Sequence, residues 1–285
     1  MPSTPKDRDA AWAALRGPYD PARLAAMARL PWREVRLVAE TGSTNADLAA
    51  LARAGEPGGL VLVAERQTAG KGRLGRAWSA PEGACVTASV LLRPEAPPAR
   101  LGWLPLLAGL AVAEALGDLA ARDPAGMAEV KWPNDVLLGE GKAAGILAER
   151  IVDRSGGPMA VVLGLGVNVA LAADERPVAA ATSLRLAGAS PTAREEVLGS
   201  VLAHLGALLG QWVAHAGDPR TSGLRDRYVA CCATVGRAVT VALPGGESLE
   251  GRAVDVDVDG RLVVESPSGA RWIVSAGDVV HATHA

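Results

Sequence analysis

Between two apolar runs the sequence carries the stretch Glu65-Arg-Gln-Thr-Ala-Gly-Lys-Gly-Arg-Leu-Gly-Arg-Ala-Trp78. The runs at residues 60–64 and 84–92 each predict a buried strand by their length and branching, so the stretch between them is expected to be a loop. Glycines let a loop backbone adopt positive φ and approach a ligand closely, and cations attract an anion. The loop carries three glycines and four cations beside the single acid Glu65: Gly70, Gly72, Gly75, Arg66, Lys71, Arg73 and Arg76. Such a loop suits an anionic ligand, although a solvated connector of the same composition is an open alternative.

Length and composition predict a globular protein with one large domain and one small domain. With 285 residues and 49% hydrophobic content, the chain can bury a full core. The formal net charge is −2 and no run of like charges appears, which argues against a general electrostatic surface for nucleic acid or an anionic membrane. Any cationic site must therefore be local, and neither nucleic acid nor a membrane is expected as a partner.

The sequence favours a cytoplasmic location. No apolar stretch reaches the roughly 18 residues that span a bilayer, and residues 1–9 lack the hydrophobic core of a signal peptide. Cys85, Cys231 and Cys232 are odd in number and lack metal-ligand or redox spacing, which suits a reducing compartment.

The N-terminal part predicts a lead, a short helix, a strand and a capped helix. Residues 1–19 are charged and contain prolines, so they are expected to be unstructured. Asp20 and the proline after it begin a helix as N-cap and first helical residue, and residues 35–39 alternate like a strand. The run Ser43-Thr44-Asn45 then precedes another helix. It is either an ordinary cap or a set of side chains that holds a polar ligand beside free N–H groups.

A turn beyond the core helix expected at residues 101–121 carries an unusual variety of functional groups. Pro133 forces a turn in the run Lys131-Trp132-Pro133-Asn134-Asp135, which offers a cation, a ring, an amide and a carboxylate. Lys142 then begins a strand of small residues that includes Gly145, leaving room for something flat to lie against the backbone. Simple turn chemistry and an exposed hairpin lysine are the competing interpretations.

Two glycines mark the apolar strand expected at residues 160–169. Gly164 and Gly166 are not followed by a helix, so they do not form a dinucleotide fingerprint and instead predict close approach by another group. Residues 170–191 form a connection long enough to be a functional lid, and residues 192–215 predict a helix.

The C-terminal part changes to short strands. Beyond a helix at residues 220–230, strands are expected at 238–243, 250–258, 261–265 and 271–274, separated by glycine-containing turns. This pattern predicts a small all-β barrel without a cluster of titratable groups, which favours a role in docking or stability. The expected division is a disordered lead at 1–19, a large domain at 20–232 that carries the motifs above, and a barrel at 233–285.

Taken together, the motifs resemble those of the biotin–protein ligases. Five signatures of that family occur in order over residues 35–283, which makes the resemblance specific. They are Ser-Thr-Asn at 43–45, Gln-x-x-Gly-x-Gly-Arg-x-Gly-Arg-x-Trp at 67–78, Lys-Trp-Pro-Asn-Asp at 131–135, Lys-x-x-Gly-Ile-Leu at 142–147 and Gly-x-Gly-x-Asn at 164–168. Lys71 stands where the family usually has arginine, which keeps the charge but loses the planar fork.

The resemblance implies an α+β fold: a mixed β-sheet catalytic domain flanked by helices, like a class II synthetase, with a small C-terminal SH3-like β-barrel. It implies that biotin and ATP give biotinyl-5′-AMP and pyrophosphate, and that a lysine of a biotin carboxyl carrier domain of a carboxylase then attacks this anhydride. Mg²⁺ is the expected metal. A monomer and a homodimer are both open.

The resemblance also assigns roles to residues. Lys142, Arg73 and Asp135 are the implied catalytic residues, with Asp135 either orienting the acceptor lysine or holding Mg²⁺. The implied biotin-binding residues are Ser43, Thr44, Asn45, Gln67, Gly70, Lys71, Gly72, Arg73, Lys142 and Gly145. The implied ATP- and adenylate-binding residues are Lys71, Arg73, Arg76, Trp78, Asn134, Lys142 and Asn168.

Two alternatives belong to other classes. A lipoate or octanoate ligase shares the related fold and the carrier-lysine chemistry, but it needs an apolar tunnel rather than a polar, glycine-rich loop. A non-enzymatic biotin-sensing repressor needs a DNA-binding domain, for which the roughly 34 residues before the region of resemblance are expected to be too few.

Overall fold

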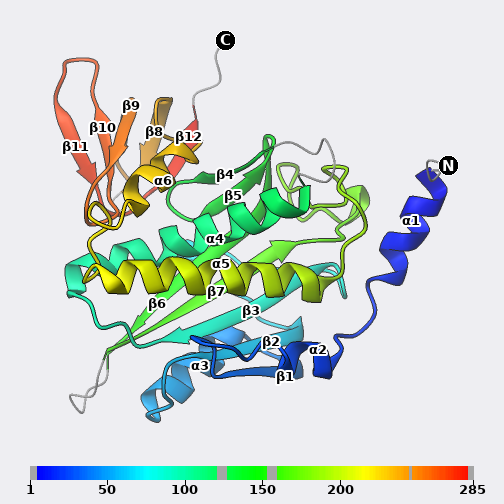
Figure 1. The fold of residues 1–285 in the computed structure, drawn as a ribbon. Helices are drawn as coiled ribbons and strands as arrows, with labels where there is room; N and C mark the ends of the chain where they lie inside the picture. Colours follow the sequence, from blue (N-terminus) through cyan, green and yellow to red (C-terminus); the bar gives the residue numbers. More distant parts are fainter. Residues whose placement is uncertain (1–4, 121–126, 153–158, 244–245, 282–285) are drawn as a thin grey trace.

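The computed structural model describes residues 5–120, 127–152, 159–243 and 246–281, and it contains two sheets (Figure 1). The larger sheet has seven strands in the order β1-β2-β3-β7-β6-β5-β4, with β1 and β2 parallel and the other neighbours antiparallel. Its strands are β1 Glu34–Thr41, β2 Leu60–Gln67, β3 Cys85–Leu92, β4 Ala128–Lys131, β5 Asp135–Leu138, β6 Gly141–Ile151 and β7 Ala160–Asn168. The expected mixed sheet is therefore confirmed.

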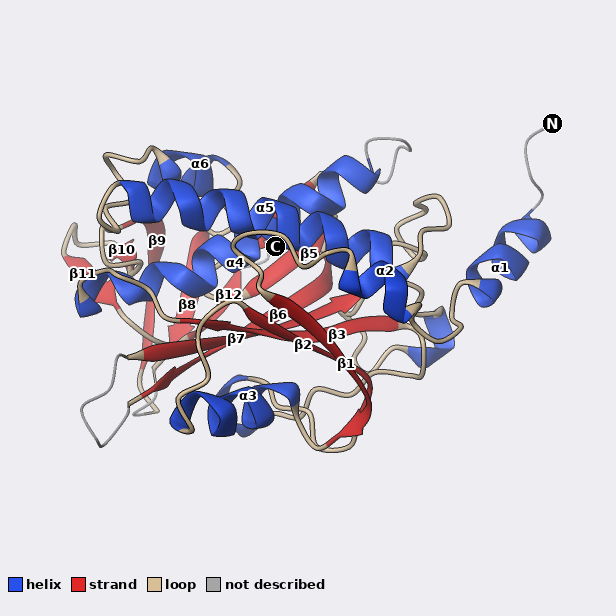
Figure 2. Cartoon of the chain, turned by 60° about the horizontal axis from the view of Figure 1, so that its bottom comes forward, coloured by secondary structure: helices blue, strands red, loops and turns tan. Residues whose placement is uncertain are grey.

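Helices cover both faces of this sheet (Figure 2). Helices α4 and α5 lie on one face and α3 lies on the other, so the central strands have no solvated side. For this reason the sequences of β3 and β7 are nearly continuous apolar runs and do not alternate between apolar and polar residues. The helices are α1 Pro5–Ala14, α2 Pro21–Ala25, α3 Thr44–Arg53, α4 Trp103–Ala120, α5 Arg194–Ala214 and α6 Leu224–Ala230.

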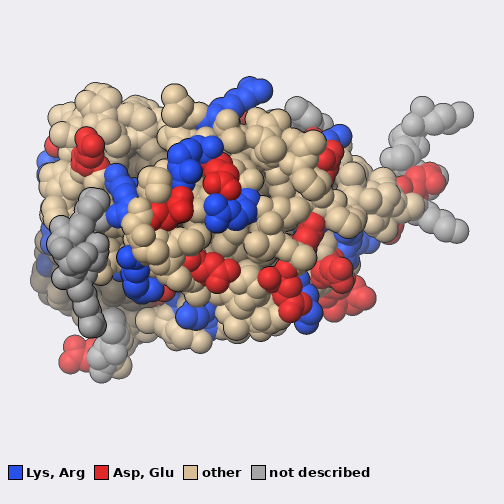
Figure 3. Space-filling view, turned by 90° about the horizontal axis from the view of Figure 1, so that it is seen from below, with Lys and Arg blue, Asp and Glu red and all other residues tan. Residues whose placement is uncertain are grey.

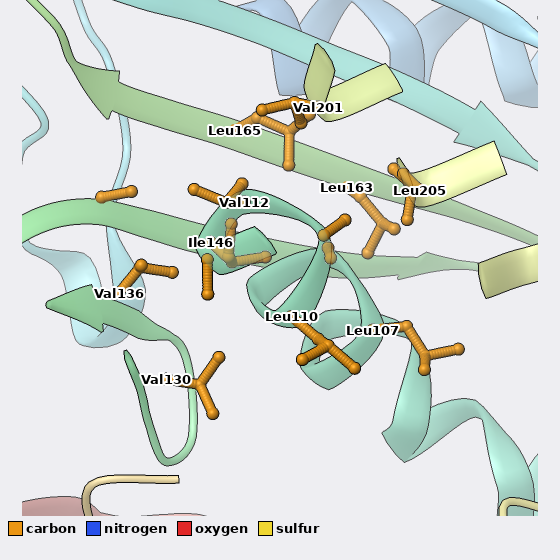
Figure 4. Packing of buried hydrophobic residues seen from close by; sticks show 14 of the residues in the cluster. Leu107, Leu110, Val112, Val130, Val136, Ile146, Leu163, Leu165, Val201 and Leu205 are labelled. Carbon is orange, nitrogen blue, oxygen red and sulfur yellow. The ribbon is translucent and has the colours of Figure 1, made fainter. Parts of the chain in front are cut away.

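The main core lies between the sheet and the α4–α5 layer (Figure 4). Leu107, Leu110 and Val112 of α4 belong to the same buried cluster as Ile146 of β6 and Leu163 of β7. Helix α4 is apolar nearly all round because almost every position on it is buried.

Two helical segments are longer and more apolar than was expected from the sequence. The segment Pro98–Ala120 and helix α5 are each long and apolar enough to cross a membrane by length and composition. The expectation that no stretch reaches this length was wrong in that respect. Both helices pack on the sheet, and 78% of the first window is buried inside the protein, which is how a core helix passes the same test.

The N-terminal segment corrects a second expectation. Residues 5–14 form helix α1 where an unstructured lead was expected. Trp12 and Tyr19 are 1% and 3% exposed, so two buried aromatic side chains anchor a segment whose other residues are mostly small or charged. Arg16 adds an ion pair of 2.8 Å to Glu175, in the connection between β7 and α5. The buried area of the two rings explains why the segment is ordered.

The smaller sheet has five antiparallel strands in the order β11-β10-β9-β8-β12. They are β8 Ala238–Ala242, β9 Ser248–Val256, β10 Leu262–Glu265, β11 Arg271–Val274 and β12 Asp278–His281. Four of these strands were predicted, and β12 was not. The sequence also predicts a hairpin turn at residues 154–158, which lie outside the described residues.

The two sheets share one continuous buried cluster. Val241 and Val256 of the smaller sheet belong to the cluster that contains α4 and β7. Trp103 Nε1 donates to Val258 O at 3.0 Å, and Trp132 Nε1 donates to Gly260 O at 3.0 Å. The two parts of the chain on either side of the expected boundary at 232/233 therefore share a packed, hydrogen-bonded interface.

Charges on the surface are mixed. On the face seen from below in Figure 3, Lys and Arg side chains alternate with Asp and Glu side chains. This distribution agrees with the net charge of −2.

Candidate functional site

A pocket of about 690 Å³ lies over the sheet and reaches the smaller sheet. It brings together sequence motifs that are more than 100 residues apart in the chain. Of the predicted site residues, all but Gly70 line it: Ser43, Thr44, Asn45, Gln67, Lys71, Gly72, Arg73, Arg76, Trp78, Asn134, Asp135, Lys142, Gly145 and Asn168.

One end of the pocket is a network of uncharged polar side chains. Thr44 donates from its backbone N–H to Gln67 Oε1 at 2.8 Å, and its hydroxyl donates to the same oxygen at 2.9 Å. Ser89 donates to Asn45 Oδ1 at 2.6 Å. Ser43 caps α3 through a bond from Ala46 N. The residues at the start of α3 therefore both cap the helix and line the pocket. Their hydrogen bonds to one another hold the donor and acceptor groups in place for a neutral polar ligand.

The opposite end is cationic. Lys142 Nζ lies 2.6 Å from Asp135 Oδ1, as an ion pair and not an aligned hydrogen bond. Arg73 donates to Asn134 Oδ1 at 3.1 Å and to Gly277 O at 3.4 Å, which are uncharged acceptors. Burial lowers the pKa of the Arg73 guanidinium, with the Asp135 charge opposing this effect. The cations here are incompletely neutralised, so this end suits an anion.

Asn168 lies behind the cationic end. Its amide donates to Thr182 O at 2.9 Å, which ties β7 to the connection that follows it. That connection also bonds to Lys142, whose backbone N–H donates to Ala180 O at 2.7 Å. Pro177, Val178 and Ala181 consequently line the pocket, as the length of the connection suggested.

The glycines of β6 and β7 make room for two side chains of the site. A Cβ on Gly166 would lie 2.4 Å from Trp78 Cε2, and one on Gly145 would lie 3.1 Å from the same ring. A Cβ on Gly164 would lie 2.5 Å from Asn45 Oδ1. The expected close approach to this strand is confirmed, and the approaching groups are Trp78 and Asn45.

Replacing Gly166 by alanine is expected to lower the free energy of unfolding by about 1–3 kcal/mol, because the new methyl group collides with the Trp78 ring. The measurement is urea unfolding. In a Trp78→Ala background the same change should cost much less. Gly117→Ala in α4, where an added Cβ meets nothing within 4 Å, is the matched control. An equal cost with and without the Trp78 ring would contradict the contact.

The central loop uses its glycines differently from the expectation. Only Gly75 has a positive φ, at 74°, and its non-glycine neighbour Leu74 has φ 55°. Gly70 lies outside the pocket lining because its part in the loop is closure: Trp78 N donates to Gly70 O at 2.9 Å, and a Cβ on Gly70 would lie 2.4 Å from Trp78 O. Close packing within the loop, and not left-handed backbone, requires Gly70.

The smaller sheet supplies one wall of the pocket, which the sequence reading missed. Asp278, Val279 and Val280 of β12 line the pocket, and Arg76 of the central loop forms an ion pair with Asp278. The expected role of the barrel in docking or stability stays a prediction, and the structure adds that its strand β12 borders the pocket. Ser89 was missed as well, although its signal is visible as a hydroxyl within the apolar run of β3.

Asp135 is the predicted metal-binding residue. Among the residues that the structure describes, no cluster of three or more His, Cys, Asp and Glu residues could hold a metal ion. The Asp135 carboxylate is already paired with Lys142, so Mg²⁺ would fit here only with phosphate oxygens as its other ligands.

Known proteins share the sequence and the fold of this chain. Residues 40–168 match the biotin/lipoate A/B protein ligase family, and residues 234–282 match the biotin protein ligase C-terminal domain. The chain is 44% identical over 252 residues to the biotin–[acetyl-CoA-carboxylase] ligase of Mycobacterium tuberculosis, covering 88% of this chain and 90% of that protein. It is 34% identical over 244 residues to the ligase of the same name from Paracoccus denitrificans, covering 85% and 98%. Among solved structures it is similar to the biotin protein ligase from Aquifex aeolicus in complex with biotin and ATP, with a TM-score of 0.69 and 25% identity over 89% of this chain and 100% of that one.

Proposed function

This chain belongs to the biotin–protein ligase family, and from that premise we propose that it activates biotin with ATP and transfers it to a carrier protein. The products of the first step are biotinyl-5′-AMP and pyrophosphate. The acceptor in the second step is a lysine of a biotin carboxyl carrier domain, as the relatives' names for ligation to acetyl-CoA carboxylase suggest. One observation supports this most strongly: a single pocket joins a neutral hydrogen-bonding end to a cationic end.

The neutral end fits the ureido ring of biotin. Such a ring offers two N–H donors and one carbonyl acceptor, and Ser43, Thr44, Asn45 and Gln67 provide uncharged partners of both kinds. Gly70 and Gly72 keep the loop compact beside this end. In this proposal biotin also contacts Gly145, whose lack of a side chain leaves room for the Trp78 ring and for Lys142.

The cationic end fits the joining of two anions. A carboxylate oxygen of biotin attacks the α-phosphorus of ATP, and the bond to the bridging oxygen of pyrophosphate breaks. Lys142 neutralises the carboxylate and the charge that develops on the α-phosphate, and Arg73 and Lys71 close over the same atoms. These residues act by positioning and electrostatics instead of forming a covalent intermediate. Bound Mg²⁺ would add charge neutralisation at the phosphates, with Asp135 as its protein ligand.

Other groups hold the nucleotide and the acceptor. Asn134 and Asn168 bind the adenylate, while Trp78 and Arg76 of the central loop form one side of its site. In the second step the neutral amine of the carrier lysine attacks the carbonyl carbon of the anhydride and AMP leaves. Orienting that amine is the alternative role of the Asp135 carboxylate to holding Mg²⁺, and its position beside Lys142 in the pocket supports this role.

Several further assignments belong to this proposal. The catalytic domain comprises residues 20–232 and the SH3-like barrel comprises 233–285, in agreement with the separate matches at 40–168 and 234–282. The protein works in the cytoplasm, where ATP and the carrier substrate are available, without a nucleic acid or a membrane as partner.

The test of the proposed function is biotin-dependent exchange of labelled pyrophosphate into ATP. Exchange with biotin and none with lipoate or octanoate is the expected result. Exchange with lipoate alone would replace the proposal by a lipoate ligase. Biotin binding without any exchange would indicate a non-enzymatic sensor.

Arg73→Gly is expected to preserve part of the adenylation but to release biotinyl-5′-AMP at least about tenfold faster, because a hydrogen bond to a charged group contributes about 1.5–3 kcal/mol. The guanidinium joins the loop to Asn134 and to the barrel, so its loss should open the pocket over a reactive anhydride. The measurement is biotin blotting of an unrelated lysine-rich protein mixed with the variant, ATP and biotin. Arg66→Gly, which removes an arginine of β2 that is paired with Glu40 outside the pocket, is the control. A variant that forms adenylate and leaks it no faster than wild type would refute the retention role.

A further inference from the structure

We propose that Lys131 is a further catalytic residue of the adenylate-forming step, binding the β- and γ-phosphates of ATP and neutralising the pyrophosphate that leaves. This inference rests on the proposed function. Lys131 is the first residue of the Lys-Trp-Pro-Asn-Asp motif, and none of the roles assigned above uses it.

Lys131 lies at the cationic end of the pocket. It is the last residue of β4, is half-buried and lines the pocket. In the sheet it is the cross-strand partner of Asp135 on β5, and β5 in turn pairs with β6, the strand of Lys142. Two lysines therefore flank one carboxylate.

The single carboxylate does not satisfy both lysines. Asp135 is paired with Lys142 at 2.6 Å. Within the described part of the chain, the Lys131 ammonium has no ion pair within 4.0 Å and no hydrogen bond, although Arg73 and Lys142 nearby each have a polar partner. A half-buried ammonium without a partner has lost part of its hydration and gained nothing in return. A bound anion would remove this cost.

Burial and a neighbouring cation both lower the pKa of the Lys131 ammonium. Burial lowers the pKa of its ammonium, the Asp135 charge opposes this, and the Lys142 charge adds to it. On the barrel side the Lys131 charge acts on His281 of β12, which is bonded to Thr234 Oγ1 at 3.1 Å. Burial lowers the pKa of His281 to about 4, so this imidazole is neutral at pH 7 and supplies no counter-charge. The surroundings of Lys131 thus leave it free to bind a phosphate group.

The order of the strands indicates which phosphates these are. Across the sheet, Gln67 and Ser89 of the neutral end lie on β2 and β3, Lys142 lies on β6, and Lys131 lies on β4 at the far edge. In an in-line displacement the leaving oxygen is on the opposite side of the phosphorus from the attacking oxygen. If biotin extends from the neutral end and its carboxylate meets the α-phosphate at Lys142, the leaving pyrophosphate points toward Lys131.

The experiment separates the two half-reactions. Lys131→Met and Lys131→Gln are each assayed for biotin-dependent adenylate formation from ATP and for biotin transfer from preformed biotinyl-5′-AMP to a carrier domain. Adenylation is expected to fall by about 100-fold, the scale of losing one donor to a developing charge, while transfer from the preformed adenylate is unchanged. Inhibition of the forward reaction by added pyrophosphate should weaken in both variants, and Lys131→Arg should recover most of the adenylation.

The control is Arg237→Met, which removes an exposed cation that also acts on His281 but lies outside the pocket lining. An equal fall in both half-reactions would mean that Lys131 binds the adenylate or stabilises the fold. An unchanged adenylation rate would mean that Lys131 has no part in this step. Either result overturns the proposal. Circular dichroism and the transfer assay show whether each variant is folded. If the wild-type protein itself shows no biotin-dependent exchange, the proposed function fails, and this outcome is distinct from normal exchange in a Lys131 variant.

Discussion

Lys142→Ala should lose about 3 kcal/mol or more of transition-state stabilisation in adenylate formation, the scale observed when one preorganised donor to a developing charge is removed. The pocket confines the Lys142 ammonium beside Gly145 and the Asp135 carboxylate, where water is partly excluded. Biotin affinity should fall far less, because the neutral end of the pocket is intact. Single-turnover adenylation and calorimetric titration with biotin measure the two quantities.

Removing Lys142 also leaves the Asp135 carboxylate without its ion pair, and this negative charge would itself repel phosphate. The double variant Lys142→Ala with Asp135→Asn separates the two effects. Partial recovery would measure the repulsion, and the remaining loss would be that of the cation. Equal losses in biotin affinity and in adenylation rate, in the single and double variants, would show that Lys142 only binds biotin.

Arg194→Ala should lower the free energy of unfolding by about 3–5 kcal/mol, the cost of breaking a buried ion pair from one side. Arg194 is 2% exposed, and its Nη2 lies 2.8 Å from Glu65 Oε2 and donates to Gly17 O at 2.8 Å. Its guanidinium carbon also lies 3.9 Å from the centre of the Tyr19 ring. The substitution would leave the Glu65 carboxylate unpaired and release the N-terminal segment from α5. Equilibrium unfolding in urea measures the loss.

Two comparisons make this result specific. Arg23→Ala removes one partner of an exposed pair with Asp20 and should change the unfolding free energy by less than about 1 kcal/mol. Arg194→Met combined with Glu65→Gln removes both charges and should be more stable than Arg194→Ala alone. A loss no larger than that of Arg23→Ala would contradict the buried pair.

Most of the catalytic domain could be predicted from the sequence because its strands are either fully buried or marked by glycines. The runs at 60–64, 84–92 and 160–169 lie in the central strands β2, β3 and β7, with helices on both faces of the sheet. Gly164 and Gly166 indicated close approach because no other function explained a glycine inside such a strand. The motif residues met in one pocket because they lie at strand ends and turns of neighbouring strands.

Other parts depend on contacts that no local pattern reveals. Helix α1 has a weak apolar face, and its order comes from Trp12 and Tyr19 packing on residues far along the chain. Strand β12 has only Val279 and Val280 as apolar residues, too short a run to stand out. Its place in the pocket follows from how the barrel packs on the sheet, and sequence periodicity carries no information about that packing.

The wall that β12 gives the pocket is an edge strand, and this has a consequence for hydrogen exchange. In the five-stranded sheet β12 pairs with β8 alone, through the four residue pairs from Asp278 to His281. Such a strand can detach at a free energy well below that of global unfolding, so its amides should exchange faster than those of β9 in the middle of the same sheet. A ligand that fills the pocket would hold β12 in place and slow this exchange. The rate at which this one strand opens would then set how often the pocket is accessible from the side of the barrel.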